Sequence, residues 1–470
     1  MKKFLFNKAN LLLLIIVFIG FLIRLYKIDQ LMIFIGDQGW FYESAKNFLT
    51  GGNFPLVGIT SSHTWLHQGP LWTYILMVIF LIFGFNPLIP GIFTVLFSVF
   101  TIWFVYKVGN DMFGKEVGLV SSFLFSLSPL VIINSRFPFD PSIIPFFAIL
   151  LIYSVFKWVN KDYKYFPIAI FSLAILYNLE LSTIILTGVF AIIFFWGLFK
   201  RKEWIRGLVS KKIILSSLVL FVVPMLPIFI YDVFNGFKQT IVFAGWLIYH
   251  SVSFLVKKST GGTTIGETLS FFVSQNSLLI FMPSVIISLV LLFSSWIYLL
   301  YKIISTKVRK IEDSYFLFFL FLIIPTISFI LNKVPSEAYL PVFFPIYIIV
   351  LSIFFTFLMR LRFMRYPIII VIIFIGVFNS YFLISQNYLS GPHNTYKSIS
   401  QVKEVSEKII SEIKGNSYNI IIKGEGSQWE SSKMNFEYYI WWVSGKEISK
   451  DSKYIFIVEQ KNGIITVRKK

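Results

Sequence analysis

Long apolar runs are the feature that most constrains what this chain can fold into. Of its 470 residues, 56% are hydrophobic and only 14% are charged, which is far from the usage of soluble proteins. Runs of about 17 to 25 apolar residues are long enough to cross a bilayer as helices, because a helix pairs its own backbone polar groups. The sequence therefore predicts a polytopic membrane protein.

About eleven such runs are expected to be transmembrane helices, of which the fifth is the shortest. A twelfth apolar stretch, residues 71–85, is expected to dip in and return without crossing, because only then do the basic connections all face one side. The predicted spans are roughly residues 10–28, 88–106, 116–134, 141–157, 165–178, 182–199, 213–231, 277–300, 314–331, 338–358 and 367–387.

Five connections rich in Lys and Arg are expected to be cytoplasmic. They read "YKVGNDMFGKE", "KWVNKDYK", "KRKEWIRGLVSKK", "YKIISTKVRK" and "MRLRFMR". Loops 30–87 and 232–276 and the chain after residue 388 then face the outside. Because no small-residue cleavage pattern follows the first apolar run, we expect an uncleaved signal anchor. The expected location is the cell membrane, with the active site on its extracytoplasmic face.

The net charge of +19 does not indicate a nucleic acid partner. The basic residues lie in short loops, where membrane orientation and lipid headgroups account for them. The chain has no cysteine, which excludes disulfides, thiolate chemistry and Cys-based metal sites.

The last 80 or so residues differ from the rest, and the predicted domains are residues 1–388 in the membrane and 389–470 outside it. Three short β-rich runs, "YNIIIKG", "KYIFIVEQ" and "GIITVRKK", are separated by Gly or Asn turns. An amphipathic helix precedes them, which indicates a small α/β domain. Its predicted apolar face consists of Ile399, Val402, Val405, Ile409 and Ile413.

Two acids, Asp37 and Asp140, are the main catalytic candidates. Each also has a structural interpretation, because Asp is a favoured helix N-cap and Asp140 precedes Pro141, which suits a first helical position. Both share the predicted outer face with Arg136, His67 and Glu180. Ionisable groups at membrane depth are costly enough to be functional candidates.

Other polar residues of the outer loops also have two interpretations. His63 and His67 are four residues apart, as metal ligands can be, but they lie in a Gly/Pro loop and no second ligand motif accompanies them, so hydrogen bonding to a sugar or phosphate is favoured. Arg136 and Lys333 either snorkel to lipid headgroups or hold a lipid phosphate from the outer side.

The order of motifs resembles a family of membrane glycosyltransferases, those of the GT-C fold, and especially the protein O-mannosyltransferase and lipid A aminoarabinose transferase branch. The resemblance rests on "GDQG" after the first span, "HQGPLWTYI", the long stretch that ends in "NSRFPFDPSIIPFFAILLIYSV", and "SEAYLPVFFPIY". It covers most of residues 1–390, and the motifs in the first 160 residues carry it best. Nothing comparable is found for the C-terminal domain.

The resemblance implies transfer of a sugar from a polyprenyl phosphate to an acceptor on the outer face, with no nucleotide sugar and often no metal. The family's first-loop acid falls on Asp37 and its second outer acid on Asp140. Two positions depart from the family pattern: the usual second acid of the first loop is Gln38, and a lysine expected near the donor phosphate is replaced by Gln68. Another cation must then serve the phosphate.

The resulting hypothesis is an integral membrane glycosyltransferase with Asp37 as general base and Asp140 as the residue that positions the acceptor or the first outer loop. Its expected partners are a polyprenyl phosphate-linked sugar, an extracytoplasmic acceptor and membrane lipids, without nucleic acid; no cofactor is expected, and a metal ion is allowed but not favoured. The alternatives are a lipid-linked sugar flippase or transporter and a polysaccharide polymerase or ligase. The candidate substrate-binding residues are His67, Gln68, Arg136, Lys333, Glu337 and Tyr339.

Overall fold

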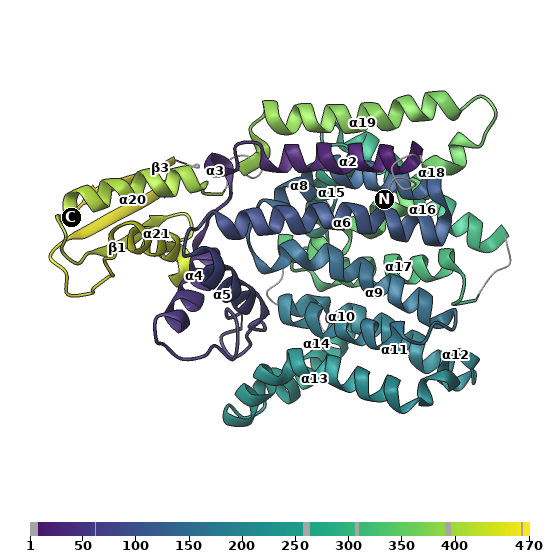
Figure 1. Ribbon diagram of the computed structural model, residues 1–470, viewed down its shortest axis with the longest axis horizontal. Helices are drawn as coiled ribbons and strands as arrows, with labels where there is room; N and C mark the ends of the chain where they lie inside the picture. The colour runs from purple at the N-terminus through teal and green to yellow at the C-terminus, as the bar shows by residue number, and fades with distance from the viewer. Residues whose placement is uncertain (1–7, 62, 257–263, 306–309, 391–395, 462–463) are drawn as a thin grey trace.

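A computed structural model describes residues 8–61, 63–256, 264–305, 310–390, 396–461 and 464–470 (Figure 1). Long helices lie side by side in a bundle, and a smaller unit that contains a β-sheet lies beyond one end of it (Figure 1). The predicted fold class is confirmed: an all-α membrane domain is followed by a small α/β domain.

Within the described part of the chain, eight helical segments are long and apolar enough to cross a membrane. Each overlaps a predicted span, because a hydrophobic run of that length has no other stable environment. The segments are α2 (Lys8–Leu25), α6 (Ile89–Phe113), η1 with α9 (Asp140–Val159), η2 with α11 (Leu181–Phe199), α13 (Lys211–Phe234), α16 (Val285–Ser305), α17 (Ser314–Asn332) and α19 (Arg365–Ser385).

The remaining predicted spans correspond to helices that are broken or short. Helices α7 (Lys115–Leu127) and α8 (Pro129–Ser135) meet at a bend of 63° and together make a ninth candidate span. The bend falls at Pro129, whose ring disfavours helical geometry in the residue before it. Helices α10 (Tyr165–Leu179) and α18 (Phe344–Met359) are apolar but shorter.

The predicted span at 277–300 is wrong in its boundaries. The chain is helical over α15 (Ile265–Ile280) and again over α16, with a break between them. Pro283 lies in that break; proline has no N–H and disfavours a helical residue before it, so the helix cannot run through. Much of the predicted outer loop 232–276 is also helical, since it contains η4 (Lys238–Val242), α14 (Phe243–Val256) and most of α15.

Neighbouring side chains pair the backbone groups exposed by the α15–α16 break. Asn379 of α19 donates to the carbonyl of Ile280 and accepts the N–H of Met282, both at 2.9 Å. The hydroxyl of Ser288 donates to the carbonyl of Phe281 at 2.9 Å. A broken helix is tolerated in a membrane domain only when its backbone groups find such partners.

Helix α5 (Leu71–Phe83) contains 13 residues, which gives a length of about 20 Å against a hydrocarbon thickness of about 30 Å. It packs against α4 (Gly36–Leu49), and both lie at the end of the bundle (Figure 1). Its length agrees with the prediction that residues 71–85 do not cross the membrane.

The C-terminal unit is a three-stranded sheet with two helices. Strands β1 and β2 are parallel and β2 and β3 antiparallel, in the spatial order β1-β2-β3. All five residues of the predicted apolar helix face are buried, so that prediction is confirmed. The elements are α20 (Ile399–Ile413), β1 (Asn419–Gly424), η8 (Glu430–Lys433), α21 (Met434–Ser444), β2 (Ile455–Lys461) and β3 (Ile464–Lys469).

The C-terminal unit packs on the first outer loop. Around Ile33 the backbone pairs with Ser398 in a β-bridge, and the N–H of Phe34 donates to the carbonyl of Lys397 at 2.9 Å. Helix α21 packs along α4. These contacts join segments from the two ends of the sequence into one layer at the end of the helix bundle.

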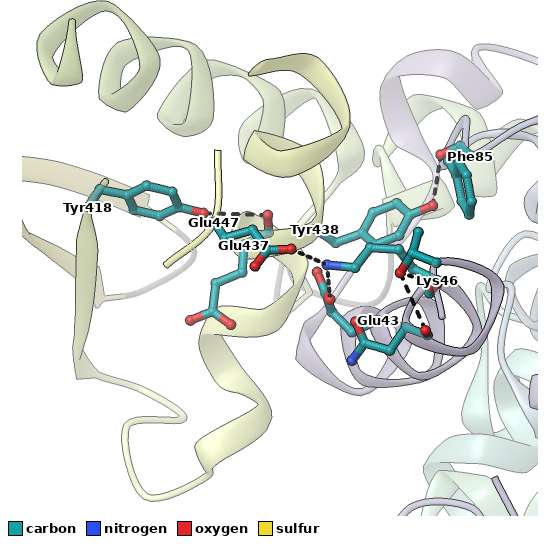
Figure 2. Close-up of polar contacts among 9 residues, drawn as sticks. Glu43, Lys46, Phe85, Tyr418, Glu437, Tyr438 and Glu447 are labelled. Carbon is teal, nitrogen blue, oxygen red and sulfur yellow. Dashed lines mark hydrogen bonds and ion pairs between the residues drawn. The ribbon is translucent and has the colours of Figure 1, made fainter. Parts of the chain in front are cut away.

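Figure 2 shows polar contacts of the interface between α4 and α21. Lys46 forms ion pairs with Glu43 at 2.6 Å and with Glu447 at 3.7 Å, and its ammonium lies 4.6 Å from the centre of the Trp441 ring. The hydroxyl of Tyr438 donates to the carbonyl of Phe85 at 2.7 Å. Lys46 is buried, and buried charges are retained only when they are paired in this way.

Candidate active site

Asp37 lies in the first turn of α4, but it does not cap that helix. The N-cap position is occupied by Ile35, and the Asp37 carboxylate accepts a hydrogen bond from the hydroxyl of Ser431 at 2.9 Å. The side chain is partly buried. Burial raises the pKa of Asp37, and the hydrogen bond from Ser431 acts in the opposite direction. The capping interpretation of Asp37 is therefore wrong.

Gln38 explains one departure from the family pattern. Its amide oxygen accepts the N–H of Ile35 at 2.6 Å, and its amide nitrogen donates to the carbonyl of Ile33 at 2.8 Å. An ionised carboxylate can only accept hydrogen bonds, so it cannot replace both contacts. The fully buried glutamine thus fixes the backbone that presents Asp37.

Asp140 begins η1 (Asp140–Ile143), and Phe139 occupies the N-cap position before it. The Asp140 side chain is 1% exposed. Neither of its carboxylate oxygens has a hydrogen-bond partner among the described residues. Asp37 and Glu180 both lie close enough to repel its negative charge, so the fold gathers three acids from three separate loops.

Glu180 joins the end of α10 to η2 (Leu181–Thr183), and its side chain is 6% exposed. Its carboxylate accepts the N–H of Ser182 at 3.2 Å and the side-chain amide of Gln68 at 3.0 Å. Burial raises the pKa of Glu180 to about 7. Tyr339 lies close enough to Glu180 for the two groups to interact electrostatically. Gln68, which stands where the family has lysine, thus pairs with a buried acid.

His67 makes hydrogen bonds with Gln239 and is not paired with His63. Its Nδ1 lies 3.1 Å from Nε2 of Gln239, and its backbone N–H donates to Oε1 of the same side chain at 3.0 Å. Burial lowers the pKa of His67. His63 instead stacks on Trp65, with ring centres 5.8 Å apart. Over the ranges that the structure describes, no group of three or more His, Asp or Glu side chains is placed to bind a metal; metal independence stays a prediction.

Arg136 occupies a position that neither sequence interpretation predicts. Its guanidinium donates to the carbonyls of Arg24 at 2.6 Å, Tyr26 at 2.8 Å and Lys27 at 3.4 Å, at and just beyond the C-terminus of α2. The side chain is 0% exposed. A cation at the C-terminal end of a helix satisfies carbonyls and opposes the helix dipole. In this structure Arg136 therefore supports the end of α2 rather than snorkelling to headgroups, and its predicted contact with a donor stays a prediction.

The last outer loop carries Lys333 and Glu337. Lys333 is the left-handed C-cap of α17 and is partly buried. Glu337 accepts a hydrogen bond from the hydroxyl of Tyr396, which ties this loop to the segment before the C-terminal domain. Their predicted contacts with substrate stay predictions.

The structure thus brings Asp37 and Glu180 close to Asp140, with Gln68 and Tyr339 beside Glu180, whereas Arg136 bonds the end of α2. Glu180 is predicted to lie on the outer face but has no role in the predicted site, and Ser431, which bonds Asp37, is not among the predicted residues. A buried acid between two apolar runs was a usable signal for Glu180, whereas nothing in the sequence around Ser431 connects it to Asp37.

Comparisons with known sequences match part of the chain. The family model described as dolichyl-phosphate-mannose-protein mannosyltransferase matches residues 67–231. An uncharacterized protein of Aquifex aeolicus is 26% identical over 166 residues, which are 35% of this chain and 31% of that protein. The chain therefore spans about a third of the length of this relative.

Comparisons with solved structures match nearly the whole chain. The oligosaccharyltransferase AglB of Archaeoglobus fulgidus, solved with an inhibitory peptide and a dolichol-phosphate, superposes with a TM-score of 0.61 at 12% identity over 94% of this chain and 64% of that one. ArnT of Cupriavidus metallidurans, solved with undecaprenyl phosphate, gives a TM-score of 0.60 at 10% identity over 96% and 93%. The chain has the GT-C fold. The resemblance inferred from the motifs is confirmed at this level, and the protein is a multi-pass membrane protein.

Proposed function

We propose that this GT-C protein is a glycosyltransferase that moves a sugar from a polyprenyl phosphate to a hydroxyl of an extracytoplasmic acceptor in the cell membrane, with Asp37 as general base. One observation carries the proposal. Asp37 is a partly buried carboxylate at the end of the helix bundle, and one of its oxygens is fixed by Ser431. Two proteins with this fold were solved with a polyprenyl phosphate bound.

The chemistry follows from the two oxygens of Asp37. Ser431 holds Oδ1, and no hydrogen bond reaches Oδ2 from any residue that the structure describes. As the acceptor oxygen attacks the anomeric carbon, Oδ2 takes the hydroxyl proton, the new carbon–oxygen bond forms, and the bond to phosphate breaks. The polyprenyl phosphate leaves with the bonding electron pair.

Asp140 is better suited to bind the sugar than to accept the proton from the acceptor hydroxyl. Both of its buried oxygens lack partners, as does Oε1 of Gln68, within the described ranges. A buried acceptor without a hydrogen bond costs free energy, and this cost is recovered when a ligand supplies a donor. A sugar supplies several hydroxyl donors, so we assign Asp140 and Gln68 to binding the transferred sugar or the acceptor.

The donor phosphate requires a cation, because negative charge grows on it as the sugar departs. The position of Arg136 at the end of α2 argues against that residue. Lys333, at the end of α17, is our candidate, and its ammonium would act as a point charge on the phosphate. Exchange of Lys333 for Ala should weaken donor binding, whereas Lys333→Arg should retain most of it.

The test is sugar transfer by the full chain in nanodiscs, with a polyprenyl phosphate sugar as donor. Asp37→Asn keeps the size of the side chain and an oxygen that can accept from Ser431, but it removes the base. We expect transfer to fall by about 10² to 10⁴, with unchanged thermal unfolding. Asp29→Asn is the matched control, because Asp29 lies in α3 (Ile28–Leu31) on the same outer loop, outside the group of acids.

Four results would count against the proposal. Transfer by Asp37→Asn at the wild-type rate would remove Asp37 as base. Activity with a nucleotide sugar but not with the lipid donor would reject the donor class. Movement of intact lipid-linked sugar across the membrane without transfer would favour the flippase, and transfer of whole oligosaccharides would favour the polymerase or ligase.

A further inference from the structure

The C-terminal domain reaches the candidate base directly. Ser431, in η8, donates its hydroxyl to Oδ1 of Asp37 across 394 residues of sequence. The contact is a single hydrogen bond, so its importance depends on whether the surrounding structure holds Ser431 firmly in place.

Two glycines of the "GDQG" motif allow the segment that carries Ser431 to approach α4 closely. A Cβ atom at Gly36 would lie 2.8 Å from Cα of Ser432, and one at Gly39 would lie 2.7 Å from Cα of Asn435. Both distances are too short for real Cβ contacts. Glycine is therefore required on the face of α4 against which η8 and α21 pack.

Side chains fix the same segment directly after Ser431. Asn435 donates its side-chain amide to the carbonyl of Phe34 at 2.8 Å. Lys397 donates to the carbonyl of Ser432 at 3.4 Å, and its ammonium lies 5.0 Å from the centre of the Phe436 ring. Asn435 and Lys397 are buried, so these bonds are shielded from water and resist rearrangement.

We propose that Ser431 is a positioning residue for Asp37, and that the C-terminal domain thereby completes the active site. The catalytic part of this inference rests on the function proposed above. Ser431 itself touches no reacting atom, since it bonds the oxygen opposite the one that takes the proton.

The hydrogen bond has two physical effects. It fixes the rotamer of Asp37, so that Oδ2 keeps one orientation toward the acceptor. It also stabilises the ionised carboxylate, against the burial that raises the pKa of Asp37. A base must be ionised before it can accept a proton, so both effects favour transfer near neutral pH.

The first experiment compares Ser431→Ala, Ser431→Thr and wild type over a range of pH. We expect kcat/KM of Ser431→Ala to fall about tenfold, because a hydrogen bond to a charged group is lost. The rise of kcat/KM with pH should move up by about one pH unit. Ser431→Thr keeps the hydroxyl and should recover most of both effects. Ser444→Ala is the control, because its hydroxyl bonds only backbone groups at the end of its own helix: it donates to the Ile440 carbonyl and accepts the N–H of Lys446.

The second experiment needs no substrate. A hydrophobic carbodiimide reacts with protonated carboxyl groups, so the pH at which labelling of Asp37 is half-maximal, read by mass spectrometry, reports its ionisation. We expect this midpoint to rise in Ser431→Ala and to stay in place in Ser431→Thr.

The two experiments separate the two proposals. An unchanged labelling midpoint, or an unchanged pH profile in an active enzyme, would overturn the role of Ser431. A shifted midpoint in a protein that transfers no sugar from any lipid donor would support the contact between Ser431 and Asp37 and would refute the proposed function.

Discussion

Gly39→Ala offers a sharp test of how the C-terminal domain meets the active site. Gly39 lies on α4, two residues after Asp37, and its face touches the backbone of the C-terminal domain. A single methyl group there should act on catalysis without touching any side chain of the site.

The structure sets the size of the effect. The added Cβ would clash most closely with the backbone N of Asn435, and it would lie 2.7 Å from Cα of the same residue. Because an ordinary contact begins at 3.4 Å, the two backbones must separate by more than about 0.7 Å. The same movement would stretch the 2.9 Å bond between Ser431 and Asp37 beyond about 3.6 Å, at which no hydrogen bond remains. Overpacking of this kind costs about 1 to 3 kcal/mol of stability.

Gly188→Ala is the matched control. Gly188 also lies inside a helix, α11, but a Cβ there would meet no atom within 4 Å. Alanine improves helix propensity by about 1 kcal/mol at either site, so the two variants differ chiefly in the clash. We expect transfer by Gly39→Ala to fall at least as far as in Ser431→Ala, and its thermal unfolding temperature to drop, while Gly188→Ala matches or exceeds wild type.

The reasoning would be refuted by a Gly39→Ala protein with wild-type transfer and wild-type unfolding temperature. That result would mean that α21 can move away from α4 at no cost. The close approach would then have no bearing on the site.

Three further predictions concern the acids, the end of α2 and the orientation. Because the folded protein binds the Glu180 proton more tightly than the unfolded chain, with a pKa of about 7 against 4.5, the free energy of unfolding should fall by about 3 kcal/mol as pH rises through that window. Glu180→Gln should remove this pH dependence, which is measured by comparing thermal unfolding at about pH 5 and at about pH 8. If the stability of the variant changes with pH as much as that of the wild type, the prediction is contradicted. Arg136→Ala should destabilise the fold by about 2 to 4 kcal/mol, because three backbone carbonyls lose their donor. Arg136→Lys should restore only part of this stability, since lysine lacks the planar fork. If both variants unfold as the wild type does, Arg136 does not support α2 and the interpretation as a lipid-headgroup contact is favoured again. Single cysteines at positions 37 and 450 should react with an impermeant reagent in intact cells, and labelling of either only after the cells are broken would reverse the orientation.

The membrane helices could be predicted from the sequence because their information is local. A run of apolar residues specifies a span by itself, and the spacing of Ile399, Val402 and Val405 specifies a buried helix face by itself. The boundary error at 277–300 had a local cause as well, since Pro283 marks the break.

The candidate site could be predicted only in part, because its contacts are not local. Asp37 and Asp140 stood out as acids near apolar runs. Arg136, however, bonds carbonyls about 110 residues earlier, and Ser431 bonds an acid 394 residues earlier. No periodicity or spacing specifies such pairs, and the same guanidinium suits a phosphate, a headgroup or a helix end.

The distance in sequence between Asp37 and Ser431 also bears on how the protein is made. At about 5 to 20 residues per second, the ribosome reaches Ser431 roughly 20 to 80 s after Asp37. During that interval the helices between them can enter the membrane while the glycine face of α4 has no partner. A nascent chain interrupted before η8 would therefore have its membrane domain but an incomplete catalytic centre. The order of synthesis delays activity until the domain that carries Ser431 has been translated and has docked.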